Sequence, residues 1–315
     1  MKGIVIRNTG SHYVVRIDGT GREVNCKIKG NFRIKGIRTT NPVAVGDRVE
    51  VAPPGPDGTA YITAIEPRRN YIIRKASNLS KEAHIIAANV DCAALVVTLV
   101  HPATSTVFID RFLATASAYD VPAALIINKT DLLTDPEDRE LLDAVTYLYR
   151  SIGYKVFEVS AKTGSGLERL REFLRGKITL LSGNSGVGKS TLVNDLIPGL
   201  DVRTAEISEA HDTGMHTTTF SELYYLPGED AGAIIDTPGV RGFGTIDFDK
   251  YQVSHYFPEM FREAANCRFG NCTHTHEPGC AVLAALDEGR IAQSRYASYL
   301  SILEDIDEGK YRKPF

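Results

Sequence analysis

The sequence predicts three regions of different architecture: a small all-β barrel, a central α/β domain built on a parallel sheet, and a short C-terminal region held together by a metal ion. Three observations predict this order. Short alternating strands fill residues 2–67, continuous apolar runs alternate with helical stretches after residue 89, and Cys and His residues cluster after residue 247. With 315 residues, the chain has room for two or three domains that each bury an apolar core.

Composition narrows the class of protein. The chain is 43% hydrophobic and 24% charged, as in soluble globular proteins. The basic start at residues 1–7 has no long apolar core, and the most apolar run, residues 90–100, is about half the ~20 residues of a membrane helix. We therefore expect a cytoplasmic protein without a membrane anchor. Five cysteines in such a chain favour free thiols or metal ligands over disulfides.

The N-terminal region, for which we predict the boundaries 1–69, is expected to form the barrel. Its strands alternate apolar and polar residues between Gly, Asn and Pro turns, for example at residues 3–7, 13–17 and 47–51. Residues 53–58 contain three prolines, which remove backbone donors and predict a loop between the last strands. No long helix fits before residue 80.

Positive charge is concentrated in this N-terminal region. Residues 1–70 hold 12 Lys and Arg against 6 Asp and Glu, whereas the whole chain has a formal net charge of −3. One stretch combines a single acid, Glu23, with six basic residues, namely Arg22, Lys27, Lys29, Arg33, Lys35 and Arg38. Such a face could follow the phosphates of RNA. The alternative is a solvated basic surface with no partner.

The central region, residues 70–246, is expected to form a parallel sheet covered by helices on both faces. Continuous apolar runs alternate there with helical stretches, as in βαβ units. The expected strands lie at residues 92–100, 122–128, 154–160, 177–182 and 231–236. A last helix is expected near residues 291–306, within a C-terminal region of residues 247–315.

A phosphate-binding loop follows the fourth of these strands. The sequence GNSGVGKST matches G-x-x-x-x-G-K-[ST] in the required strand, loop and helix context, although a glycine-rich turn is the alternative. Its glycines let backbone amides converge on phosphate oxygens at a helix N-terminus. Lys189 would neutralise the β and γ phosphates, Ser190 would bind Mg²⁺, and Thr191 would lie near the α-phosphate. The predicted loop residues are Gly183, Asn184, Ser185, Gly186, Val187, Gly188, Lys189, Ser190 and Thr191.

Two further segments predict which base is bound. They are N-K-T-D (Asn128, Lys129, Thr130 and Asp131) and S-A-K (Ser160, Ala161 and Lys162), each at the end of an apolar strand. The Asp131 carboxylate can accept hydrogens from guanine N1 and N2, which adenine lacks. Asn128 would brace the neighbouring loop, Lys129 would cover the purine face, and a backbone amide of S-A-K would contact guanine O6. Each match is weak alone, but together they favour a GTPase over an ATPase.

A fourth segment, D-T-P-G from Asp236 to Gly239, ends another apolar strand. In GTPases its aspartate reaches Mg²⁺ through water and its glycine amide contacts the γ-phosphate. The order of the segments is circularly permuted, because N-K-T-D and S-A-K precede the phosphate loop here and follow it in ordinary GTPases. A cut after D-T-P-G and a link through residues 163–176 would give this order without moving any strand.

The polar stretch from His211 to Thr219 is interpreted as the switch. Thr217 or Thr218 would close on Mg²⁺ and the γ-phosphate. Many GTPases orient the attacking water with a Gln after D-x-x-G, but Val240 stands there and cannot orient water. His216 is therefore the candidate for that task. The alternative is a surface histidine in a solvated loop.

A cluster of four residues in the C-terminal region has the spacing C-x4-C-x-H-x5-C, namely Cys267, Cys272, His274 and Cys280. Three thiolates and one imidazole suit a tetrahedral zinc ion with a structural role. His276 is an alternative to His274, and redox-active or inert thiols are alternatives to a metal site. Cys26 and Cys92 lie in apolar strand patterns and are expected to be small core residues.

Together these motifs closely resemble those of the RsgA (YjeQ) family of bacterial small ribosomal subunit biogenesis GTPases. The likeness covers nearly the whole chain and rests on NKTD at 128–131, GNSGVGKST at 183–191, GMHTTT at 214–219, DTPGVRGF at 236–243 and the Cys and His cluster. The resemblance implies an N-terminal OB-fold, a circularly permuted GTPase domain and a zinc domain. It also implies binding to the 30S subunit and its 16S rRNA late in maturation, with GTP hydrolysis stimulated by that particle. The family's water-positioning histidine corresponds to His216.

Two function classes remain open on the sequence. One is a GTPase that acts as an assembly checkpoint or release factor, and the other is a nucleotide-gated RNA-binding module with negligible catalysis, which Val240 leaves possible. The expected ligands are GTP and GDP with Mg²⁺, and one structural Zn²⁺. Nothing in the sequence suggests an obligate dimer, so a monomer is expected.

Overall fold

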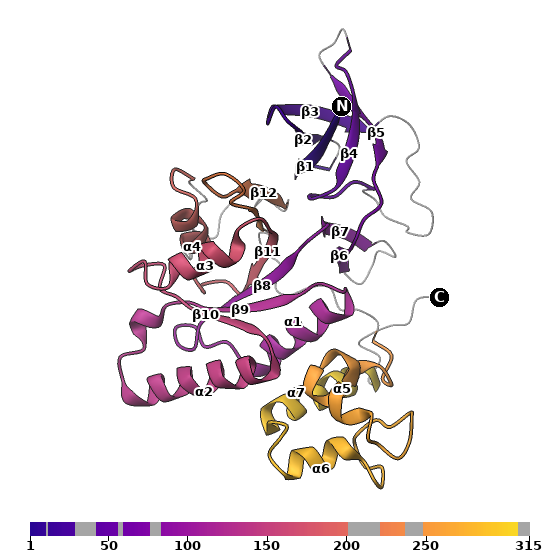
Figure 1. Ribbon diagram of the computed structural model, residues 1–315, viewed down its shortest axis with the longest axis vertical. Coiled ribbons are helices and arrows are strands. Elements are labelled where there is room, and N and C mark those ends of the chain that lie inside the picture. Colours follow the sequence, from indigo (N-terminus) through magenta and orange to yellow (C-terminus); the bar gives the residue numbers. More distant parts are fainter. Residues whose placement is uncertain are drawn as a thin grey trace, which may run out of the picture.

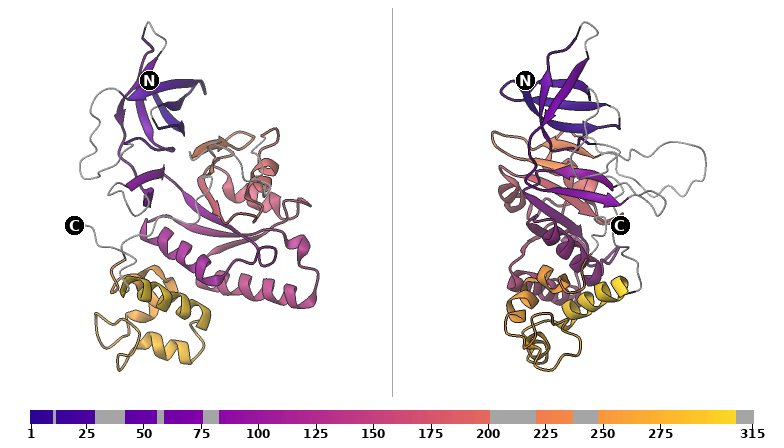
Figure 2. Two further views of the ribbon diagram at one scale, coloured as in Figure 1. Left: turned by 180° about the vertical axis from the view of Figure 1, so that it is seen from behind. Right: turned by 90° about the vertical axis from the view of Figure 1, so that its right-hand side faces the viewer.

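The computed structural model describes residues 1–10, 12–28, 42–55, 59–75, 83–200, 221–236 and 248–307. They form three parts in a row, with the barrel at one end, the α/β domain in the middle and the helical region at the other end (Figure 1, Figure 2). The predicted fold class is confirmed in all three parts. None of the described helices is both long enough and apolar enough to cross a membrane.

Five strands close into the N-terminal barrel: β1 (Lys2–Asn8), β2 (Tyr13–Ile17), β3 (Glu23–Ile28), β4 (Arg48–Ala52) and β5 (Ala60–Ile65). They are ordered β1-β2-β3-β5-β4, and β4 pairs back with β1. The β3 and β5 pair is parallel and the other pairs are antiparallel. This is the closed Greek-key arrangement of an OB-fold. Buried residues such as Val5, Tyr13, Val15 and Ile62 fill its interior.

Six strands form the sheet of the central domain, in the order β10-β9-β8-β11-β13-β12. Their bounds are β8 (Cys92–Val97), β9 (Ala123–Ile127), β10 (Lys155–Glu158), β11 (Ile178–Gly183), β12 (Glu222–Tyr225) and β13 (Ala233–Asp236). All neighbours are parallel except β12, which runs antiparallel to β13. The five strands predicted from apolar runs are confirmed, although β8 ends at Val97 rather than at residue 100.

Helices cover both faces of this sheet. On one face, α1 (Thr106–Ala118) and α2 (Pro136–Ile152) pack through residues such as Phe112 and Tyr149. On the other face, α3 (Leu167–Leu174) and α4 (Lys189–Leu196) pack through residues such as Leu170 and Leu192. Because both faces are covered, every residue of β8 is buried, which explains its continuous apolar run.

The apolar pattern missed the short strand β12 and the hairpin of β6 (Tyr71–Lys75) and β7 (Ala83–Ala88), which follows the barrel. β12 pairs with β1 where Arg7 faces Glu222, so one 11-stranded sheet continues from the central domain into the barrel. Arg7 Nε donates to Glu222 Oε1 at 2.8 Å. Such edge pairing depends on how the barrel and the central sheet pack against each other. The sequence of a four-residue strand does not predict that arrangement.

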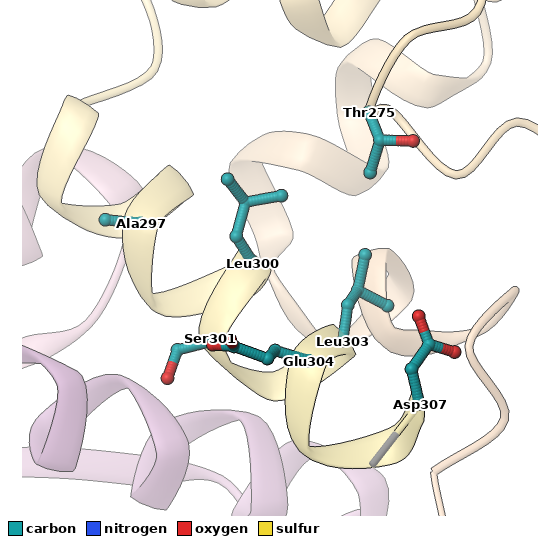
Figure 3. A pocket seen from close by; sticks show the side chains of 7 residues that line it. All are labelled: Thr275, Ala297, Leu300, Ser301, Leu303, Glu304 and Asp307. Carbon is teal, nitrogen blue, oxygen red and sulfur yellow. The ribbon is translucent and has the colours of Figure 1, made fainter.

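The C-terminal region is mainly helical, as predicted. Its elements are η2 (Val253–Tyr256), α5 (Pro258–Ala264), α6 (Ala281–Asp287) and α7 (Gln293–Asp307), of which α7 is the predicted last helix. An open groove between α7 and the loop bearing Thr275 is lined by Thr275, Ala297, Leu300, Ser301, Leu303, Glu304 and Asp307 (Figure 3). None of the residues predicted to bind nucleotide lines this groove.

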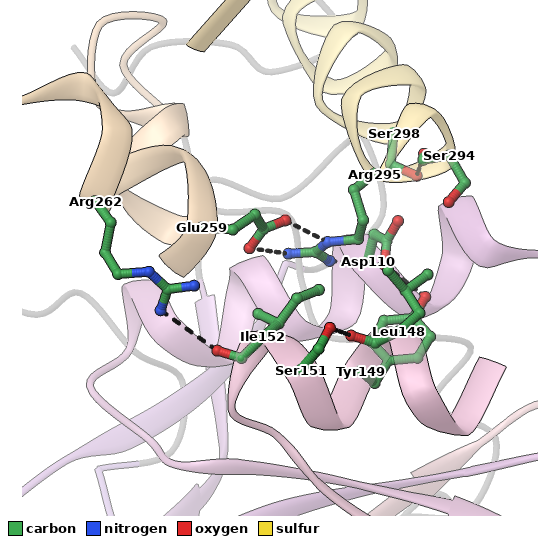
Figure 4. Close-up of polar contacts among 10 residues, drawn as sticks. All are labelled: Asp110, Leu148, Tyr149, Ser151, Ile152, Glu259, Arg262, Ser294, Arg295 and Ser298. Atoms are coloured by element: carbon green, nitrogen blue, oxygen red, sulfur yellow. Dashed lines mark hydrogen bonds and ion pairs between the residues drawn. The ribbon is translucent and has the colours of Figure 1, made fainter. Parts of the chain in front are cut away.

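One buried arginine joins this region to the central domain (Figure 4). Arg295 of α7 is 1% exposed, and its guanidinium donates to Glu259 Oε1 of α5 at 2.6 Å and to Asp110 Oδ1 of α1 at 2.7 Å. The Tyr149 hydroxyl of α2 donates to the same Asp110 oxygen at 2.7 Å. Burial raises the pKa of Asp110, and the charge of Arg295 opposes that shift. Removing the arginine would therefore leave two buried carboxyl groups without their cation.

We expect Arg295→Ala to lower the free energy of unfolding by about 3 to 5 kcal/mol, because breaking a buried ion pair strands its partners. Urea denaturation followed by circular dichroism measures this change. Arg290→Ala is the matched control, since Arg290 makes exposed ion pairs with Glu263 and Glu288 in the same region and its loss should leave stability near that of the wild type. Equal effects of the two substitutions would contradict a special role for Arg295.

Candidate functional site

The predicted phosphate loop connects the end of β11 to the start of α4, at the carboxyl edge of the parallel sheet. Gly186 and Gly188 have φ angles of +83° and +84°, a region that side chains disfavour. A Cβ at Gly188 would lie 2.6 Å from Asn128 Nδ2, and one at Gly183 would lie 2.6 Å from Val96 O. The glycines therefore permit both the turn of the loop and its close approach to the neighbouring strands.

Lys189 and Asp236 meet beside this loop. Lys189 begins α4, and its Nζ lies 3.1 Å from Oδ1 of Asp236, the last residue of β13. Asp236 is 5% exposed, and this ion-paired oxygen accepts no hydrogen bond from the described residues. Ser190 and Thr191 follow in the first turn of α4. A buried carboxylate oxygen at this edge of the sheet is the kind of ligand that Mg²⁺ prefers, directly or through water.

Asn128 joins three of the predicted segments. It is 2% exposed, its Nδ2 donates to Val187 O in the phosphate loop at 2.9 Å, and its Oδ1 accepts from Ala161 N at 3.1 Å. These partners lie 59 and 33 residues away along the chain. The N-K-T-D segment, the S-A-K segment and the phosphate loop therefore meet around one side chain.

Asp131 is held by the S-A-K segment. It lies in the short 3₁₀ helix η1 (Thr130–Leu132), and its Oδ1 accepts a hydrogen bond from Ser160 Oγ at 2.6 Å. Thr130 donates through its N and its Oγ1 to Val159 O, at 3.2 and 3.1 Å. Lys162 is exposed. The hydrogen bond from the buried Ser160 orients the carboxylate that the sequence predicts to face guanine.

The loop after β8 adds contacts that the sequence did not predict. Lys129 Nζ donates to His101 O at 2.7 Å. A Cβ at Gly186 would lie 3.5 Å from Pro102 Cδ, so the same loop also borders the phosphate loop. The available signal was the proline-containing stretch at residues 101–105, which directly follows the apolar run of residues 90–100.

Four predicted site residues lie outside the residues that the structure describes: His216, Thr217 and Thr218 of the switch, and Gly239. The same holds for Val240 and for four of the basic residues in the N-terminal stretch of the sequence, namely Lys29, Arg33, Lys35 and Arg38.

The four residues of the Cys and His cluster converge. The ligand atoms of Cys267, Cys272, His274 and Cys280 all lie within 4.8 Å of one another. Cys267 Sγ is 3.9 Å from Cys280 Sγ, and His274 Nδ1 lies 3.6 and 3.4 Å from these two sulfurs. A tetrahedral ion with bonds of about 2.3 Å to sulfur and about 2.0 Å to nitrogen spaces its ligands by about 3.5 to 3.8 Å. The cluster could therefore hold a metal ion.

His274 rather than His276 belongs to this cluster. His274 is 2% exposed, whereas His276 is exposed and its Nδ1 contacts Thr275 Oγ1. Burial lowers the pKa of His274 and so favours the neutral imidazole that binds metals. Tyr296 of α7 donates its hydroxyl to His274 O at 2.8 Å, which ties the cluster to α7. The structure thus resolves the alternative that the spacing left open.

Comparison with known protein families finds two matches that follow each other along the chain. The model of the RsgA N-terminal domain matches residues 2–62, and that of the RsgA GTPase matches residues 65–246. The boundary between the two matches, between residues 62 and 65, falls within β5, the last strand of the barrel.

Curated relatives and solved structures are similar over nearly the whole chain. The small ribosomal subunit biogenesis GTPase RsgA of Bacteroides fragilis is 59% identical and that of Porphyromonas gingivalis is 61% identical, each over 100% of both chains. The crystal structure of YjeQ from Thermotoga maritima is 34% identical, with a TM-score of 0.79 over 97% of this chain and 98% of that one. YloQ, described as a circularly permuted GTPase, is 28% identical, with a TM-score of 0.75 over 100% of this chain and 96% of its own.

We expect Cys280→Ser to reduce the metal bound to the purified protein to below about a tenth of the wild-type content. The reason is that a closed four-ligand site binds its metal much more weakly when one of the four ligands is removed. Elemental analysis measures this content. Cys92→Ala is the control, since Cys92 is buried in β8 outside the cluster, and this variant should retain the metal. Wild-type metal content in Cys280→Ser would show that the cluster is not the binding site.

Proposed function

This chain belongs to the RsgA GTPase family, and from that premise we propose that it binds the small (30S) ribosomal subunit late in its maturation and hydrolyses GTP to GDP and phosphate as an assembly checkpoint or release factor. One observation carries the proposal: three segments far apart in the chain meet at Asn128, at the carboxyl edge of the sheet. Open α/β sheets bind nucleotides at that edge.

The phosphates are assigned to the loop after β11. Its backbone amides and the N-terminus of α4 would bind phosphate oxygens, and Lys189 would neutralise the β and γ phosphates. Mg²⁺ bound with GTP would neutralise further phosphate charge, held by the Ser190 hydroxyl and, through water, by Asp236. The remaining phosphate contacts are assigned to Gly183, Asn184, Ser185, Gly186, Val187, Gly188 and Thr191, with Gly239 at the γ-phosphate.

The base is assigned to Asp131, with the Lys129 stem over the purine face and the Ala161 amide at guanine O6. The hydrogen bond from Ser160 to Asp131 supports this assignment, because it fixes the carboxylate through one lone pair of Oδ1 and leaves the other lone pairs of both oxygens to accept from the base. Thr130 and Lys162 shape the ends of the two loops. A site built to pair with guanine N1 and N2 leaves its carboxylate unsatisfied with adenine, which is the source of selectivity.

Asp131→Asn should reverse the base preference, because an amide at this position matches the oxygen of xanthine at C2 rather than the amino group of guanine. Competition binding with GDP, XDP and ADP measures the preference. We expect GDP affinity to fall by roughly a hundredfold or more and XDP to become the preferred ligand. Unchanged preference for GDP in the variant would remove Asp131 from the base site.

Hydrolysis is assigned to the switch. His216 would orient the attacking water, since Val240 replaces the glutamine that many GTPases use, and Thr217 or Thr218 would close on Mg²⁺ and the γ-phosphate. The runner-up function, a nucleotide-gated RNA-binding module with negligible catalysis, rests on the same Val240.

Phosphate release with and without purified 30S subunits separates these two functions. We expect the subunits to stimulate turnover by at least about tenfold, and His216→Ala to abolish most of that turnover while leaving GTP affinity near the wild-type value, because the histidine acts on water rather than on bound nucleotide. Turnover that is negligible in both conditions would establish the RNA-binding module instead. Normal turnover in His216→Ala would show that another group orients the water.

The barrel, residues 1–69, is the proposed RNA-binding domain and would contact 16S rRNA. Arg22 is exposed, and β3 alternates the buried Val24 and Cys26 with exposed residues that include Lys27. Both basic residues therefore face outward, where they could follow phosphates. Residues 70–246 would form the GTPase domain and 247–315 the metal domain, in a cytoplasmic monomer.

Zinc is the proposed metal of the C-terminal cluster. Three cysteine sulfurs and one imidazole nitrogen are the ligand set that zinc prefers, and the distances of 3.4 to 3.9 Å among Cys267, His274 and Cys280 are close to those of tetrahedral coordination. Four protein ligands close the site and leave no position for a substrate. The ion would therefore stabilise the fold of this region.

A further inference from the structure

The loop after β8 touches both the base side and the phosphate side of the proposed nucleotide site. It connects Val97, the last residue of β8, to Thr106, the first residue of α1. His101 O accepts the hydrogen bond from Lys129 Nζ, and Pro102 borders Gly186 of the phosphate loop. None of the sequence motifs includes this loop.

Thr98, the first residue of this loop, forms hydrogen bonds with later residues of the loop. The residue is 0% exposed, and its Oγ1 donates to Pro102 O at 2.5 Å. Its backbone N donates to Thr104 Oγ1 at 3.3 Å, and its backbone O accepts from Thr104 N at 2.9 Å. Three hydrogen bonds thus join the buried residue at the start of the loop to Pro102 in its middle and to Thr104 near its end.

The loop is also anchored to the N-K-T-D segment at its start. Val97 O, one residue before Thr98, accepts a hydrogen bond from Asn128 N at 2.8 Å. The backbone of Lys129 therefore follows a residue that is paired with the start of the loop, and the Lys129 side chain contacts the same loop again at His101. The carbonyl that receives its ammonium belongs to His101, directly before the residue that Thr98 holds.

We propose that Thr98 is a positioning residue for guanine-nucleotide binding that acts through the His101 carbonyl on Lys129. The inference rests on the proposed function, in which the Lys129 stem covers the purine. A lysine stem has several rotatable bonds, and an anchored ammonium removes much of that freedom before the base arrives. Thr98 holds the anchor in place, so its hydroxyl pre-organises a contact that it does not itself make.

Thr98→Val tests this role, because valine keeps the shape of threonine and removes the hydroxyl. We expect the dissociation constant for fluorescent GDP and the KM for GTP to rise roughly fivefold, the size expected for one hydrogen bond, while kcat is unchanged. Thr98→Ser retains the hydroxyl and should restore wild-type affinity. Thr115→Val is the matched control, since it removes another buried hydroxyl, bonded to Arg111 O in α1, and should bind GDP as the wild type does.

A double-substitution cycle shows whether the effect passes through Lys129. Thr98→Val should weaken GDP binding in the wild-type background and have no further effect in a Lys129→Ala background, because the anchored side chain is then gone. Independent, multiplying effects of the two substitutions would overturn the proposal, as would wild-type affinity in Thr98→Val. Thr104→Val, at a half-buried position of the same loop, provides a second route to the same result if Thr98→Val does not fold.

The wild-type protein separates failure of this inference from failure of the proposed function. Wild-type binding of GDP in preference to ADP supports the proposed function whatever the Thr98 variants do. If the wild type binds neither, or both equally, the proposed function fails and the role of Thr98 fails with it. If the wild type selects GDP and the Thr98→Val variant binds it equally well, the inference about Thr98 alone is wrong.

Discussion

The parallel pairing of β11 with β8 on one side and β13 on the other is the constraint on which the site depends. Its register places Gly183 opposite Val96 and Leu181 opposite Asp236. Because parallel strands end at the same edge of a sheet, the phosphate loop, the Asp236 carboxylate and the loop after β8 leave the sheet together. A register shift of one residue would turn the Asp236 side chain to the opposite face and separate it from Lys189.

Two junctions of different physical character hold the three parts of the chain together. The barrel joins the central sheet by strand pairing, by an exposed ion pair between Arg7 and Glu222, and by buried side chains, among them Ile4 and Ile6, that pack in the core of the central domain. The helical region joins through Arg295, which is buried with its two carboxylate partners. An exposed ion pair is screened by water and contributes little to stability. Removal of a buried cation is costly, because its carboxylate partners are then buried without a compensating charge. The two ion pairs therefore differ in how much their loss would destabilise the chain.

Short polar side chains organise the proposed nucleotide site by forming hydrogen bonds with neighbouring protein groups, so that they fix the positions of those groups. Asn128 joins the phosphate loop to the S-A-K segment, Ser160 orients Asp131, and Thr98 closes the loop that anchors Lys129. Each is nearly or fully buried. Buried hydrogen bonds are costly to break without replacement, so such residues fix the geometry of the more exposed groups around them.

The sequence by itself determined the fold class and the family, because apolar runs, glycine positions and ligand spacing are local features that survive permutation of the segment order. It also placed the main strands, since a strand buried on both faces must be continuously apolar, as β8 is. It could not show that β12 pairs with β1, that His274 rather than His276 belongs to the Cys and His cluster, or that His101 O accepts a hydrogen bond from Lys129. Those features depend on which residues meet after the chain has packed, and backbone carbonyls and sheet edges carry no signature in the residue letters. Only the tertiary structure decided them.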